Sequence, residues 1–134
     1  MIKFTIAIAV LSAFMAHEAK ADCVSEMIYH EARSESFAGQ IAVANVAYNR
    51  AENSGKSVCR EIHKPKQFSY LNSGHLPPIK EQDAYRTAKY AAEFAKWIDV
   101  TSGATHYNTR KLGYRKGARN KREIGNHVFY KLEG

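Results

Sequence analysis

The apolar run near the start of the chain is the feature that best predicts which residues belong to the folded domain. The run spans 13 residues, Phe4 to Ala16, with only two polar members, and Lys3 precedes it. Ala19-Lys20-Ala21 then matches the A-x-A pattern at which secretory signal peptides are cleaved. An uncleaved anchor is the alternative, but the run is shorter than the roughly 18 residues of a membrane span. We therefore expect residues 1–21 to be removed and residues 22–134 to fold as one exported domain, periplasmic or extracellular.

Export changes how the two cysteines are interpreted. Cys23 and Cys59 both remain after cleavage, and an even pair in a small exported domain predicts a disulfide. Two cysteines alone do not make a zinc site, and neither cysteine lies in a C-x-x-C redox motif. A bond that closes this loop would stabilise the fold by about 3–4 kcal/mol in the loop-entropy model.

Apolar spacing predicts three helices. The first covers the residues after Cys23 and ends near Arg33-Ser34, and Ser36 is a candidate N-cap for a second helix over 37–50. Residues 55–78 contain three prolines and two glycines, so we expect them to be irregular. A third helix is predicted over 79–97, with Pro78 at its start and a buried face of alanines. Trp97, at its end, is expected in the core.

Short β segments follow the helices. Ala104–Asn108 and Ile124–Tyr130 are candidate strands that would pair as a hairpin. His106 and His127 would then face each other across it, in a structural role rather than as a metal site. The sequence therefore predicts a single α+β domain, mostly helical, with a small C-terminal β-hairpin or sheet.

The positive charge is concentrated in one stretch. The mature chain carries +6, and Arg110 to Arg122 holds seven basic residues and no acid. Such a stretch either binds an anionic polymer or is a solvated loop that aids solubility, and the sequence leaves both open. Nucleic acid is disfavoured as the partner, because only Tyr114 interleaves with the basic residues and because the chain carries an export signal.

Glu31 is the main candidate for acid chemistry. It follows Met27 and Ile28 at helical spacing, so its carboxyl is expected on the apolar, inward face. Burial there would raise its pKa and keep it protonated, as a general acid for glycosidic cleavage requires. The alternative is a buried carboxylate paired with Arg33 or Arg50. Glu35 would share the face of Glu31 only if the first helix continued past Ser34, where we expect it to break.

Metal and nucleophile motifs are missing from the sequence. His30-Glu31 begins like the zinc motif H-E-x-x-H, but Ser34 occupies the position of the second histidine. The chain also has no G-x-S-x-G elbow, phosphate loop or G-x-G-x-x-G. We expect neither a metal nor another cofactor.

Seven segments, taken together and in order, resemble the SleB-type cell wall hydrolases, the spore-cortex-lytic enzyme family. Any one of them is weak, but their order over nearly the whole mature chain is specific. They are Ile28-Tyr29-His30-Glu31-Ala32-Arg33-Ser34-Glu35, Gly39-Gln40-Ile41-Ala42-Val43-Ala44, Asn49-Arg50, Val58-Cys59, Gln67-Phe68-Ser69, Gly103-Ala104-Thr105-His106-Tyr107 and Ile124-Gly125-Asn126-His127-Val128-Phe129-Tyr130.

The resemblance implies a lysozyme-like or lytic-transglycosylase-like domain. Its implied substrate is peptidoglycan, cut at the β-1,4 bond between N-acetylmuramic acid and N-acetylglucosamine. Glu31 takes the place of the family's catalytic acid. Ring closure by the muramic C6 hydroxyl needs only that carboxyl, whereas hydrolysis as a muramidase would need a second base, for which Glu35 is the nearest candidate.

The matched segments also supply candidates for binding the glycan strands, and these are Gln67, Ser69, Thr105, His106 and Tyr107. The implied protein is an exported monomer that acts in the cell wall without a stable membrane anchor. The alternative is a non-catalytic peptidoglycan-binding module of the same fold, which the presence of Glu31 disfavours.

Overall fold

The structure is a computed structural model that describes residues 22–65, 67–74 and 76–132. The predicted signal peptide, residues 1–21, lies outside the described residues. None of the described helices is long and apolar enough to cross a membrane.

The first two helices begin and end at signals that the sequence contains. Helix α2 (Cys23–Ala32) starts at Asp22, whose side chain accepts a hydrogen bond from the Val24 backbone N–H at 2.9 Å. Helix α3 (Phe37–Ser54) starts at Ser36, whose hydroxyl oxygen accepts from the Gly39 N–H at 3.1 Å. The predicted break between the helices and the N-cap are confirmed. Helix α3 runs four residues beyond Arg50 and ends at Gly55, whose φ of 69° suits a glycine C-cap.

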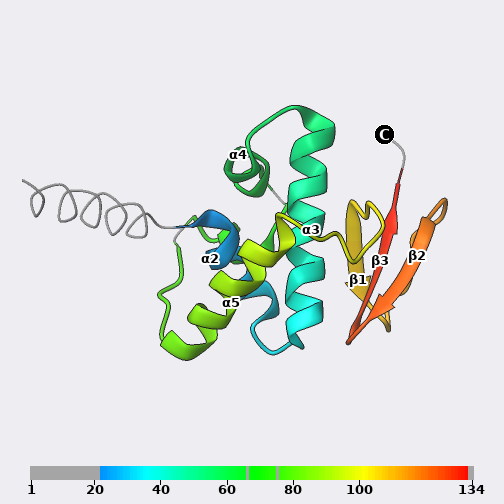
Figure 1. Ribbon diagram of the computed structural model, residues 1–134. Helices are drawn as coiled ribbons and strands as arrows, with labels where there is room; N and C mark the ends of the chain where they lie inside the picture. The colour runs from blue at the N-terminus through cyan, green and yellow to red at the C-terminus, as the bar shows by residue number, and fades with distance from the viewer. Residues whose placement is uncertain (1–21, 66, 75, 133–134) are drawn as a thin grey trace, which may run out of the picture.

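The central part of α3 is buried on all sides. All nine residues from Gly39 to Ala47 are buried, and the alanines among them allow neighbouring elements to approach closely. In Figure 1, α3 lies between the other helices and the sheet. The helix therefore joins the two layers of the domain.

The segment predicted to be irregular contains two short helices, α4 (Val58–Ile62) and the 3-10 helix η1 (Ser69–Leu71). The predicted disulfide is confirmed: Cys23, the first residue of α2, is bonded to Cys59 in α4. Phe68, only 2% exposed, fixes the start of η1 against the core.

Helix α5 (Gln82–Ala95) is shorter than predicted. It begins three residues after Ile79, and Pro78 lies in a segment without regular secondary structure before it rather than at its start. The predicted alanine face is buried at Ala88, Ala91, Ala92 and Ala95.

The expectation that Trp97 lies in the core is wrong, since Trp97 is 82% exposed. Helix α5 ends at Ala95, and the buried side chain of Asn45 fixes the turn that follows. Its amide donates to the carbonyls of Ala95 and Ile98, and its oxygen accepts from the Val100 N–H. These bonds hold the backbone of the turn to α3 and leave Trp97 on the outside.

The sheet has three antiparallel strands in the order β1-β3-β2. They are β1 (His106–Thr109), β2 (Arg119–Ile124) and β3 (His127–Lys131), and the two predicted strands pair as β1 and β3. The strand β2 was not predicted. It takes up the last four residues of the basic stretch, which is therefore part loop and part edge strand.

His106 and His127 do not face each other, contrary to expectation. The register pairs His106 with Tyr130 and Thr109 with His127, so the two histidines lie at opposite ends of the strand pair. The α+β class, with a mostly helical layer and a small C-terminal sheet, is confirmed (Figure 1).

Candidate active site

Glu31 lies on the last turn of α2, at the edge of the buried face rather than within it. Met27 and Ile28 are fully buried, whereas Glu31 is only partly buried. Ser69 on η1 donates a hydrogen bond from its hydroxyl to Oε1 of Glu31 at 3.2 Å. The expected enclosure of Glu31 in the apolar core is therefore wrong, and neither Arg33 nor Arg50 forms an ion pair with it: Arg33 is bonded to Glu81 instead.

Tyr107 on β1 lies within the electrostatic influence of Glu31. Its ring stacks on Phe129 with the ring centroids 5.8 Å apart. The rings of Tyr107 and His127 form a T-shaped pair with centroids 5.4 Å apart. Burial raises the pKa of Tyr107, the charge of Glu31 raises it further, and the charge of Arg50 lowers it. The phenol is therefore neutral at ordinary pH and lies in the fields of both Glu31 and Arg50.

Glu35 occupies a different setting, in the turn between α2 and α3. Its side chain is only 5% exposed. The backbone and side-chain N–H groups of Asn126 donate to its two carboxylate oxygens at 3.2 and 2.9 Å, and Nδ1 of His127 donates to Oε1 at 2.5 Å. Burial alone would raise the pKa of Glu35, but these hydrogen bonds and the charge of His127 outweigh it and lower the pKa below its usual value.

These bonds connect the helical layer to the sheet. Asn126 and His127 lie at the turn between β2 and β3, and the backbone of Gly125 in that turn lies close to the Glu35 side chain. A Cβ at Gly125, which has φ of 59°, would contact Oε1 of Glu35 at 3.6 Å. The sheet is thus held against the α2–α3 turn through one ionised carboxylate.

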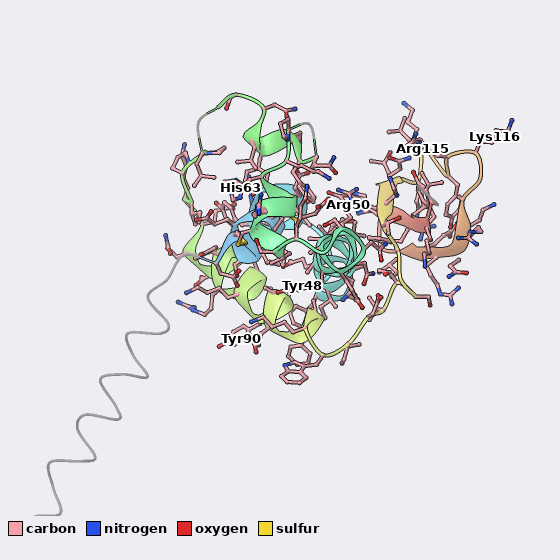
Figure 2. The ribbon with its side chains drawn as sticks, turned by 90° about the horizontal axis from the view of Figure 1, so that it is seen from above. Tyr48, Arg50, His63, Tyr90, Arg115 and Lys116 are labelled. Atoms are coloured by element: carbon pink, nitrogen blue, oxygen red, sulfur yellow. A yellow bond between two sulfur atoms is a disulfide. The ribbon has the colours of Figure 1, made fainter. Side chains whose placement is uncertain are left out.

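Arg50 is a residue whose role the sequence did not reveal. Its Nε donates to the Thr105 carbonyl at 2.6 Å and its Nη1 to Gln67 Oε1 at 3.0 Å, and the guanidinium lies 5.4 Å from the centre of the Phe68 ring. Arg50 thereby fixes the 67–69 segment, which carries Ser69, against the start of β1. Figure 2 shows Arg50 between α3 and the sheet.

The five predicted binding residues divide into two groups. Ser69 donates to Glu31, and Tyr107 lies near enough for the charge of Glu31 to raise its pKa. Gln67, Thr105 and His106 line a separate cavity of about 350 Å³ beside Arg50. The hydroxyl of Thr105 is already engaged, since it accepts from the Leu132 N–H and shares a hydrogen bond with His106.

The sequence alone assigned no chemistry to Asn126 and His127, although both lie in the segment 124–130 that resembles the family. Within the described residues, no group of three or more His, Cys, Asp or Glu side chains is arranged to hold a metal ion.

Solved structures place this arrangement in a known class of domain. The catalytic domain of the germination-specific lytic transglycosylase SleB from Bacillus anthracis matches with a TM-score of 0.66 and 27% identity, over 81% of this chain and 91% of that chain. The catalytic domain of the Bacillus cereus SleB protein matches with a TM-score of 0.63 and 25% identity, over 81% and 86%. The fold is that of SleB catalytic domains.

The chain belongs to the Cell Wall Hydrolase family, whose sequence model matches residues 34–130. A spore cortex-lytic enzyme of Halalkalibacterium halodurans is 29% identical over 111 residues, which are 79% of this chain. The chain spans about a third of the length of that relative, 33%. The family match includes Glu35 and the five binding candidates but begins three residues after Glu31.

Proposed function

We propose that this protein is an exported enzyme that cleaves peptidoglycan at the β-1,4 bond between N-acetylmuramic acid and N-acetylglucosamine, with Glu31 as the general acid. The observation that carries the proposal is the contrast between the two acids. Glu31 is partly exposed and has one hydroxyl partner, whereas both oxygens of Glu35 are engaged by Asn126 and His127. Only Glu31 is free to exchange a proton with a substrate.

The chemistry needs one carboxyl that changes its protonation state. Protonated Glu31 gives its proton to the glycosidic oxygen as the bond from that oxygen to muramic C1 breaks. The muramic C6 hydroxyl oxygen then bonds to C1, and its proton returns to the Glu31 carboxylate. The products are a 1,6-anhydromuramic end and a new N-acetylglucosamine end, and no water is consumed.

Ser69 and Tyr107 support this role. The Ser69 hydroxyl donates to the ionised form of Glu31 that remains after proton transfer. Tyr107, whose pKa is raised by burial and by the charge of Glu31, keeps a neutral phenol near that carboxylate. Hydrolysis would need a base that activates water, and the engaged carboxylate of Glu35 is poorly placed for that task. These contacts favour lytic transglycosylation.

Mass spectrometry of fragments released from purified sacculi tests the reaction. Transglycosylation releases fragments about 18 Da lighter than hydrolysis does, because ring closure replaces the addition of one water. Release of reducing ends would instead assign a muramidase and make a second base necessary. If the folded protein binds sacculi but releases nothing, it is a binding module of the same fold. Sequencing the N-terminus of the secreted protein tests export, with Asp22 expected as the first residue.

A further inference from the structure

The cavity beside Arg50, which we name the Arg50 pocket, has no role in the chemistry proposed above. Its walls come from several parts of the chain: α3 with Arg50, the segment from α4 to the following loop with Lys64 and Gln67, the start of β1 with Thr105 and His106, and Leu132 after β3. The pocket therefore opens where the helical layer meets the sheet.

Arg50 has donors left over in this pocket. A guanidinium carries five N–H donors, and the structure records hydrogen bonds for two, to the Thr105 carbonyl and the Gln67 side chain. Both acceptors are neutral. Among the described residues no carboxylate lies within ion-pair distance of Arg50, and burial lowers its pKa. A partly buried cation without a counter-ion favours an anion beside it.

The other charges around the pocket add to this field. The only acid in its wall, Glu61, is buried and already bonded to the Ser54 hydroxyl at 3.1 Å and to Lys64 at 3.6 Å. Burial, Arg50 and Arg115 lower the pKa of His106, which is therefore uncharged near neutral pH. Arg50 is the charge left unbalanced.

The Arg50 pocket is adjacent to Glu31. Gln67 and Ser69 flank the buried Phe68, and Gln67 accepts from Arg50 while Ser69 donates to Glu31. Residues 67–69 therefore join the two sites, and a polymer bound at Glu31 would lie beside the Arg50 pocket.

We propose that the Arg50 pocket binds a carboxylate of the stem peptide carried by the muramic sugar next to the cleaved bond. The inference rests on the proposed function, because it takes peptidoglycan as the polymer at Glu31. The sugars and their N-acetyl groups are neutral, so the carboxylates of the peptides are the anions that this polymer offers. An arginine fork held by Gln67 and Thr105 is the donor geometry that suits a carboxylate.

The test compares glycan strands that carry stem peptides with strands whose peptides an amidase has removed and whose freed muramic lactyl carboxylates have been converted to neutral methyl amides. Wild-type protein is expected to cleave the peptide-bearing strands with a kcat/KM about tenfold higher. Arg50→Lys keeps the charge but loses the fork, and Arg50→Gln loses both. Each substitution is expected to cost about tenfold more on peptide-bearing strands than on peptide-free strands. Lys64→Gln should show the same bias to a smaller extent.

The difference between the two substrates separates recognition from folding, since a partly unfolded variant loses activity on both equally. Lys89→Gln removes the same charge from the exposed face of α5, outside both the Arg50 pocket and the basic stretch, and should show no bias between the substrates. Equal losses on both substrates for Arg50→Gln would overturn the assignment.

Binding gives the same comparison without cleavage. Glu31→Gln protein should bind peptide-bearing strands more tightly, and adding Arg50→Gln should abolish that preference. If the wild-type protein cleaves neither strand, the proposed enzyme activity fails. Loss of the binding preference in the double variant would still support the pocket, and equal binding of both strands would overturn it.

Discussion

Glu31 and Glu35 are four residues apart in sequence, and the structure gives them opposite surroundings. Glu31 ends a helix at a partly open surface with one serine hydroxyl. Glu35 begins the next turn, enclosed, and accepts three hydrogen bonds from residues more than 90 positions away. A proton donor must exchange protons with its substrate, whereas a carboxylate that holds two layers together must stay ionised. The local surroundings, not the residue type, separate these tasks.

The largest effect is expected from Glu31→Gln. Loss of the general acid should lower kcat/KM on sacculi by about 10³-fold. The amide has nearly the same size and replaces only one hydrogen bond, so the midpoint of thermal unfolding should change little. Muropeptide release and circular dichroism on the same sample measure both. If Glu31→Gln stays active while Glu35→Gln is inactive and folded, the two roles are reversed.

The next effect concerns the helix that carries Glu31. Replacing Cys23 and Cys59 with serine releases the start of α2 from α4 and should lower the free energy of unfolding by about 3–4 kcal/mol. Denaturant unfolding of the oxidised wild type and the double variant measures it. Reduced wild type is the matched control and should behave like the variant; a stability unchanged by reduction would contradict the prediction.

Glu35→Gln should act on stability first. The amide cannot accept the same three hydrogen bonds with a full charge, so the free energy of unfolding should fall by about 2 kcal/mol. Activity measured well below the unfolding midpoint should fall far less than in Glu31→Gln. Asn126→Ala, which removes one donor to the same carboxylate, is the partner variant and should have a smaller effect in the same direction.

The pH dependence of stability should depend on the same carboxylate. Because the folded-state pKa of Glu35 lies below its ordinary value of 4.5, its stabilisation is present above that value and is lost as the pH falls through the folded-state pKa. The difference in unfolding midpoint between wild type and Glu35→Gln should therefore shrink below pH 4.5. A constant difference down to the acid limit would show that Glu35 is not the group that titrates.

The smallest effect is expected on the basic stretch. Replacing Arg115, Lys116 and Arg119 with serine should weaken binding to sacculi, most at low salt, and leave the unfolding midpoint nearly unchanged. Cosedimentation at two salt concentrations measures it. Binding that is unchanged at low salt would favour a solvated loop without a binding role. Arg115 and Lys116 lie on the sheet side of the domain (Figure 2).

The sequence was most informative where a local signal decides the structure. Ser36 begins α3 as predicted, and its hydroxyl accepts from the Gly39 N–H three residues on. The disulfide followed from export and an even cysteine count. Strand β2 carried no such signal, because five of its six residues are exposed and an edge strand of this kind lacks the alternation of apolar residues that predicts strands.

The site was harder to predict because its decisive contacts are long-range. Glu31 could be selected from its helical spacing and its resemblance, but its exposure depends on where η1 places Ser69, 38 residues away. The bonds from Asn126 and His127 to Glu35 span more than 90 residues, which no local pattern encodes. The prediction for Trp97 failed for a similar reason. Asn45, about 50 residues earlier, bonds to the turn after α5, and this turn leaves Trp97 exposed.

The contact between Glu35 and His127 also has a consequence for timing. It joins one of the earliest parts of the folded domain to its last strand, so the sheet cannot dock on the helices until nearly the whole chain is available. A chain still being synthesised would therefore lack the complete two-layer domain, and any activity that needs both layers, until its last strand has folded.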